Sequence, residues 1–302
     1  MSKKHNKAIF LCGLPIMVAS IGIFDDSPNI IETAHNDFAI LIKRSACMQQ
    51  NIPFFTRIYD NDIHMSKSFF EIRYNGITLL QINTSSTPWV VTFNNKISAN
   101  VCEELFVKIA IPYYYYTQST GLPLHATTVR YGADLICIMG ESYSGKSTLA
   151  YYLLLDNRFG LLSDDVTTIR VSSNTDKMVS AYSGSNQLKI RKETASFFST
   201  DTLLYTFPHD VDTTNNQIKC IFFIKPCDKE HPPVLRLCSK IESQCLLLKN
   251  LYASYLYKLD TNIIQTVSII CDKVKIYELD YFKDFSQLKS MKNILITQVE
   301  HN

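Results

Sequence analysis

The sequence lacks the features that mark several classes of protein. It holds no uninterrupted apolar run of the ~20 residues that a membrane-spanning helix requires, and no internal repeat or low-complexity tract. Charge of one sign is not in excess either, because the formal net charge of the 302 residues is +2 and the pI is about 8.0. Nucleic-acid-binding domains usually carry a strongly basic face, so we expect no nucleic-acid partner.

The cysteines lack the spacing of a metal site. There are nine, an odd number, and they form no C-x-x-C pair. Cys220, Cys227, Cys238 and Cys245 are the closest group in the sequence, but their spacing fits no zinc pattern. Scattered thiols are typical of a reducing compartment, so we expect a cytoplasmic protein.

An apolar segment at residues 8–24 superficially resembles a signal peptide, because three lysines precede it. Pro15 and two glycines interrupt the segment, and it is shorter than a spanning helix. We therefore expect two strands around the turn Gly13-Leu14-Pro15, and no stable insertion into a membrane.

Residues 1–118 contain several short strand patterns and one helix pattern. Asn75-Gly76 separates two of the strands, and this dipeptide is a strong signal for a tight hairpin. We expect a β-rich N-terminal domain over 1–118, with strands at 38–43, 69–74, 77–82 and 89–93 and a helix at 98–111.

Residues 119–302 alternate between strand and helix patterns, which is typical of an α/β domain. The apolar and β-branched runs predict strands at 125–129, 135–139, 161–165, 166–171, 218–224 and 274–279. Helices are expected at 146–155, 240–256 and 286–296.

A glycine-rich loop lies between the predicted strand 135–139 and the predicted helix 146–155. It satisfies the phosphate-binding pattern G-x-x-x-x-G-K-[ST]. Its glycines let backbone N–H groups approach phosphates, Lys146 would neutralise phosphate charge, and the Ser147 hydroxyl would bind Mg²⁺. The loop therefore predicts a site for ATP, or another nucleoside triphosphate, formed by Gly140, Glu141, Ser142, Tyr143, Ser144, Gly145, Lys146, Ser147 and Thr148.

Two adjacent acids, Asp164 and Asp165, follow the next apolar strand. A double Asp beside a serine is often a turn or a helix cap. Downstream of a phosphate-binding loop, however, carboxylates at a strand end are suited to holding magnesium and to acid–base catalysis. His125 precedes the loop, and a lone histidine next to an apolar run is usually a core residue.

Three segments together resemble the catalytic domain of bacterial HPr kinase/phosphorylase: Leu124-His125-Ala126, the loop 140–148, and Leu162-Ser163-Asp164-Asp165-Val166. The resemblance covers residues 122–171, is looser beyond them and is absent from 1–118. It implies an α/β fold in which helices flank a mixed sheet, kinase activity, and an HPr-kinase-like catalytic domain over 119–302. The segments show no clear match for the second signature that this family uses for dephosphorylation, so we expect no phosphorylase activity.

The layout of the chain resembles the stand-alone HPr-kinase-like enzymes of lasso peptide biosynthesis, which phosphorylate a serine of the precursor peptide. This resemblance implies that Asp164 is the general base and that Asp165 holds Mg²⁺ with Ser147, although the two acids could exchange roles. His125 would lie near the γ-phosphate or orient the aspartate, and Lys146 would stabilise the transferred phosphate. The family also assembles as homo-oligomers, which the sequence leaves open here.

Two other functions remain open. The chain could be a regulatory module that binds a nucleotide without transferring phosphate, or a kinase for a small molecule such as free serine or a sugar. Lys189, Arg191 and the loop 206–217 occupy the region where a peptide could bind, but a solvated strand and loop would give the same pattern.

Overall fold

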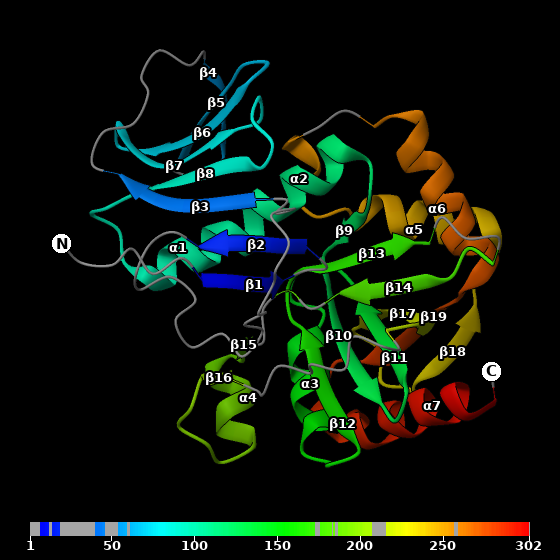
Figure 1. The fold of residues 1–302 in the computed structure, drawn as a ribbon. Coiled ribbons are helices and arrows are strands. Elements are labelled where there is room, and N and C mark those ends of the chain that lie inside the picture. The colour runs from blue at the N-terminus through cyan, green and yellow to red at the C-terminus, as the bar shows by residue number, and fades with distance from the viewer. Residues whose placement is uncertain are drawn as a thin grey trace. The chain divides into compact units, whose positions relative to one another are not determined.

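The computed structural model describes residues 7–11, 14–18, 40–45, 54–58, 61–172, 176–182, 184, 187–206, 216–256 and 259–301. The chain divides into two compact units, Met1–Ile111 and Pro112–Asn302. Figure 1 shows the elements of both.

The first unit is built on an eight-stranded sheet, in agreement with the β-rich pattern of the sequence. Its strand order is β1-β2-β3-β8-β7-β6-β5-β4, in which β3 is parallel to both β2 and β8 and the other neighbours are antiparallel. The strands are β1 (Lys7–Leu11), β2 (Leu14–Val18), β3 (Ile40–Ser45), β4 (Phe54–Ile58), β5 (Asn61–Met65), β6 (Phe69–Tyr74), β7 (Ile77–Asn83) and β8 (Trp89–Asn94).

Two predicted hairpins are present. Asn75 and Gly76 connect β6 to β7 with φ angles of 47° and 75°, the left-handed values that a two-residue hairpin turn requires. The N-terminal pair also forms, but Leu11 pairs with Leu14, so Leu14 and Pro15 begin β2 instead of forming the turn.

The helix predicted at 98–111 starts as expected, because the Ser98 hydroxyl caps α1 (Ala99–Leu105) by accepting from the Val101 N–H. It continues further than predicted, through a π-helical turn (Phe106–Ala110) into α2 (Ile111–Gln118). The second unit begins at Pro112, the second residue of α2, whereas the boundary predicted from the sequence lies after residue 118, at the end of this helix. The reason is that α2 is tied to the second unit: the Tyr116 hydroxyl hydrogen-bonds to the carbonyls of Pro123 and Tyr252.

The second unit contains a six-stranded mixed sheet with the order β12-β10-β11-β17-β19-β18. The neighbours β11, β17 and β19 are parallel and the remaining pairs are antiparallel. Both faces of the central strands are covered, which explains their continuous apolar sequences. The strands are β10 (Ala126–Tyr131), β11 (Asp134–Met139), β12 (Phe159–Ser163), β17 (Ile218–Cys227), β18 (Val234–Leu237) and β19 (Lys275–Phe282).

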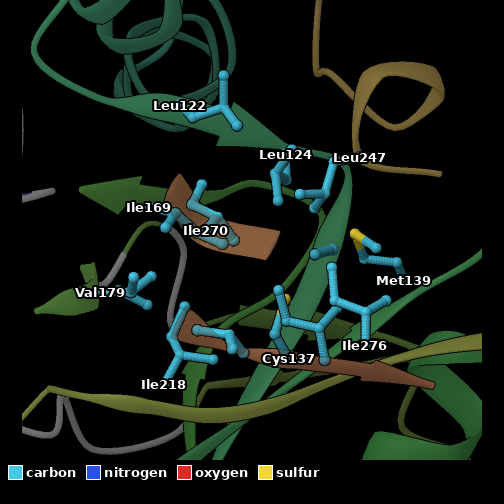
Figure 2. Packing of buried hydrophobic residues seen from close by; sticks show 14 of the residues in the cluster. Leu122, Leu124, Cys137, Met139, Ile169, Val179, Ile218, Leu247, Ile270 and Ile276 are labelled. Carbon is cyan, nitrogen blue, oxygen red and sulfur yellow. The ribbon is translucent and has the colours of Figure 1, made fainter. Parts of the chain in front are cut away.

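Two hydrophobic cores hold the layers on this sheet. Helices α3 (Lys146–Leu154) and α7 (Leu288–His301) pack on one face. Helices α5 (Lys240–Lys249) and α6 (Thr261–Lys273) pack on the other, together with a small sheet of β9 (Leu122–Leu124), β13 (Thr167–Val171) and β14 (Val179–Tyr182). In Figure 2 Cys137 and Ile276 of the main sheet lie among the apolar side chains of these elements. The architecture is thus a mixed sheet flanked by helices.

Several predicted elements differ from the structure. The helix expected at 240–256 ends at Lys249, where Asn250 caps it, and Ser254–Leu256 form a separate 3-10 turn. The sequence did not predict α6, whose β-branched residues have weak helix propensity. It forms because Asp260 caps it and because Ile263, Val267 and Ile270 bury one face. In the part of the chain that the structure describes, no helix combines the length and apolar character needed to cross a bilayer.

Candidate active site

The glycine-rich loop connects β11 to α3 and depends on its glycines. Gly140 and Gly145 have φ angles of 154° and 87°, and Tyr143 between them has a φ of 70°. A Cβ on Gly140 would lie 2.5 Å from the Ser144 Oγ, and one on Gly145 would lie 2.8 Å from the Tyr281 hydroxyl. Larger residues at the two glycine positions would therefore change the course of the loop.

Lys146, the first residue of α3, folds back over this loop. Its Nζ donates to the carbonyls of Gly140 at 2.8 Å and Glu141 at 3.1 Å, and the residue is 7% exposed. Burial lowers the pKa of Lys146, and the charges of Asp165 and Asp164 oppose that change. Ser144, which belongs to the loop, has a buried Oγ without a hydrogen-bond partner among the described residues. The loop thus offers a partly desolvated ammonium group, which suits an incoming anion.

Asp164 lies beside Ser147 and is nearly buried, with 6% of its surface exposed. The Ser147 Oγ is 3.3 Å from one carboxylate oxygen and 3.5 Å from the other, and the Thr127 hydroxyl donates to the first at 2.6 Å. Burial raises the pKa of Asp164 and the Asp165 charge adds to the rise, while the hydrogen bond from Thr127 opposes it. Serine and carboxylate oxygens are the hard ligands that Mg²⁺ prefers.

Asp165 is the more accessible acid, with a side chain that is 47% exposed. Its φ of 67° and the hydrogen bond from the Val166 N–H to the Asp164 carbonyl, at 2.8 Å, define a three-residue γ-turn. A non-glycine residue with positive φ is uncommon, and strained backbone of this kind is concentrated at functional sites.

His125 faces Asp165 from the junction between β9 and β10. Its Nε2 is 3.6 Å from the Asp165 Oδ1, and 29% of its side chain is exposed. The backbone N–H of His125 donates to the Asn250 carbonyl at 2.7 Å, and the ring contacts Tyr252 edge-on with a centroid distance of 6.3 Å. His125 is therefore fixed by a segment that lies far away in the sequence, and it is not a core residue.

Two cavities meet at these residues. The first, which we call the loop cavity, has a volume of about 570 Å³ and extends from the loop to apolar side chains of β19 and α7, including Tyr281 and Leu288. The second, which we call the acid-pair cavity, has a volume of about 560 Å³ and contains Asp164 and Lys192. Both are lined by Ser147, Asp165, Lys189, Ile190, Arg191 and Glu193.

Of the residues that the sequence singled out, His125, Ser142, Tyr143, Gly145, Lys146, Ser147, Thr148 and Asp165 line the loop cavity. Asp164 lines the adjoining one. Gly140, Glu141 and Ser144 line neither cavity. Gly140 and Glu141 contribute the carbonyls that Lys146 binds.

Lys189 and Arg191 also come together with the loop. Lys189 ends β15 (Gln187–Lys189) and Arg191 precedes α4 (Lys192–Phe197). The Arg191 guanidinium lies 3.7 Å from the centroid of the Tyr143 ring, a residue that is 65% exposed. Most of the loop 206–217, which was predicted to lie in the same region, is outside the described residues.

The sequence did not identify two residues that support the site. Thr127 holds Asp164, and its place two residues after His125 was a signal that could have been followed. Tyr281 donates to the Ser144 carbonyl and so fixes the loop, but the strand was expected to end before it. No sequence pattern connects Tyr281 with the loop.

The donor set fits a magnesium–nucleotide complex better than a metal held by protein alone. Among the described residues, no three His, Cys, Asp or Glu side chains gather as metal ligands. Mg²⁺ in phosphate-transfer sites is usually held by one or two protein ligands together with phosphate oxygens and water. The Ser147–Asp164 pair, next to the glycine-rich loop, has this character.

No family model matches the sequence, and no curated protein matches it. Among solved structures, the chain is similar to the HPr(Ser) kinase/phosphatase from Coxiella burnetii, at 12% sequence identity over 59% of this chain and 97% of that one, with a TM-score of 0.31.

Proposed function

We propose that this chain is an ATP-dependent kinase that transfers the γ-phosphate to a serine hydroxyl of a peptide or protein. The observation that carries the proposal is the convergence of Lys146 and Ser147 with Asp164, Asp165 and His125 around two joined cavities. Phosphoryl transfer requires positioning and charge neutralisation more than covalent chemistry, and these residue types provide both.

The loop cavity is the proposed ATP site. The N–H groups of the loop and Lys146 bind the phosphates, and the apolar side chains near Leu288 receive the base. Ser147 and Asp164 would hold Mg²⁺, which would neutralise phosphate charge when bound. The proximity of the Ser147 hydroxyl to both oxygens of Asp164 supports this pair as the ligands.

Asp165 is the proposed general base, which accepts the proton of the acceptor serine. This assignment exchanges the roles first expected for the two acids. It is supported by the exposure of Asp165 and by the existing contacts of Asp164 with Thr127 and Ser147. His125 orients the Asp165 carboxylate; their 3.6 Å separation is longer than a hydrogen bond and would shorten when substrates bind.

The acceptor proposed is a serine within a peptide. A lasso precursor peptide is the first candidate to test, and its support is the resemblance in chain layout alone. The acid-pair cavity is open beside Asp165, which leaves access for a side chain that projects from an extended segment.

The test measures ADP release from ATP and Mg²⁺ with no acceptor, with serine peptides including lasso precursors, with free serine and with a sugar. We expect release that depends on a peptide and falls ~10²–10⁴-fold in Asp165→Asn. Asp228→Asn is the matched control, because Asp228 is exposed and lines neither cavity. Release with free serine or a sugar would favour a small-molecule kinase, and nucleotide binding without any release would favour a regulatory module.

A further inference from the structure

We propose that the acid-pair cavity selects acceptor peptides that carry a carboxylate within a few residues of the acceptor serine. The cations that would bind this carboxylate are Lys192 and Lys189. The inference rests on the proposed function, because it identifies the class of peptide that the kinase would accept.

The acid-pair cavity has a floor and a wall of opposite charge. The floor is formed by Ser147, Asp164 and Asp165, where phosphoryl transfer would take place. The wall contains three cations in a stretch of four residues, Lys189, Arg191 and Lys192, and one acid, Glu193. With Mg²⁺ bound to the floor, the excess positive charge of the wall would face the acceptor.

The cations of this wall differ from those that serve structural roles elsewhere in the second unit. Arg236 pairs with Glu242 at 2.8 Å and with Glu278 at 3.1 Å, and Lys292 pairs with Asp156 at 2.8 Å. In the described ranges, by contrast, no carboxylate lies within ion-pairing distance of the side-chain nitrogens of Lys189, Arg191 or Lys192. The wall therefore has capacity to bind an external anion.

The three cations can be divided between the two substrates. Arg191 lies over Tyr143 of the glycine-rich loop, so it is directed toward the triphosphate. Lys192 lines the acid-pair cavity and not the loop cavity, so its natural ligand belongs to the acceptor. Lys189 lines both cavities and can support either substrate.

The size of the cavity limits where the carboxylate can be. A volume of about 560 Å³ is on the order of 8 Å across, which corresponds to two or three extended residues at about 3.4 Å each. An aspartate or glutamate within that distance of the serine could reach Lys192 while the hydroxyl reaches Asp165. Leu203, which also lines the cavity, offers an apolar contact to the same segment.

The experiment uses three fluorescein-labelled serine peptides that differ at one position beside the serine, which is Asp, Asn or Lys. For the wild-type protein we expect the KM to rise about fivefold from Asp to Asn, the upper end for an exposed ion pair, and further for Lys. In Lys192→Glu the order should reverse, so that the Lys peptide has the lowest KM. Lys229→Glu is the matched control and should keep the wild-type order, since Lys229 is exposed and lines neither cavity.

Failure of the inference and failure of the proposed function give different results. Equal KM values for the three peptides, or an unchanged order in Lys192→Glu, would overturn the inference while the kinase activity stands. If no peptide is phosphorylated, fluorescence anisotropy with a non-hydrolysable ATP analogue tests the inference separately. Tighter binding of the Asp peptide that is lost in Lys192→Glu would support the cationic wall, and binding without preference would contradict it.

Discussion

Replacing Asp165 by glycine should stabilise the second unit and abolish the proposed phosphoryl transfer. Asp165 has a φ of 67° in a γ-turn, and left-handed backbone costs a non-glycine residue roughly 1–2 kcal/mol. Glycine removes this cost and the repulsion from the Asp164 charge, but it adds about 0.4–1 kcal/mol of chain entropy to the unfolded state. The exposed contact with His125 is worth only ~0.2–1 kcal/mol.

The net gain expected for Asp165→Gly is about 0.5 kcal/mol in the free energy of unfolding, or about 1–2 °C in Tm for a unit of this size. Differential scanning fluorimetry without nucleotide can measure the shift. Asp165→Ala lacks the charge but keeps a Cβ, so its Tm should lie below that of Asp165→Gly. Ser199→Gly, at an exposed residue with a φ of 53°, is a control for relief of backbone strain without a change of charge. A Tm for Asp165→Ala equal to or above that of Asp165→Gly would refute the argument that this turn is strained.

Three further predictions concern the loop and its surroundings. In urea unfolding, Gly145→Ala should destabilise the protein more than Gly132→Ala. Both glycines have positive φ, but only at Gly145 would the added Cβ lie 2.8 Å from the Tyr281 hydroxyl. Equal losses in the free energy of unfolding would contradict this steric explanation. Burial is the main reason that the pKa of Asp164 is raised in the folded protein. The protonated Asp164 carboxyl therefore contributes stability below the unfolded pKa of about 3.9, and this contribution is lost as pH rises through the folded pKa. Without nucleotide or metal, Asp164→Asn should therefore lose less stability than wild type between pH 4 and pH 7, and parallel pH profiles would count against this. Magnesium–ADP at a hundred times its Kd should stabilise the wild type by about 2.7 kcal/mol, with little effect on Lys146→Ala; an undiminished thermal shift in the variant would exclude the lysine from the site.

The local parts of the site could be predicted from the sequence. The strand, loop and helix around residues 135–154 were predicted almost to the residue, because the glycines, Lys146 and the flanking apolar runs lie within one short segment. The strand before Asp164 and Asp165 was also recognisable from its apolar residues. Such signals depend on neighbours in the sequence, which a single chain displays directly.

The contacts that orient the site could not be predicted in the same way. His125 is held by Asn250, within a segment that was expected to be helical, and the loop is held by Tyr281. Helix α6 shows the same difficulty, because burial of its apolar face outweighs its weak helix propensity. The roles proposed for the two acids likewise rest on burial and on the turn at Asp165, which their adjacent positions in the sequence do not reveal.

The most direct test of the kinase proposal is tandem mass spectrometry of serine peptides, lasso precursors among them, after incubation with ATP, Mg²⁺ and the protein. We expect one phosphate on a peptide serine with the wild-type protein and with Asp228→Asn, and almost none with Asp165→Asn. The absence of phosphopeptide despite demonstrated ATP binding, or undiminished phosphorylation by Asp165→Asn, would contradict the account.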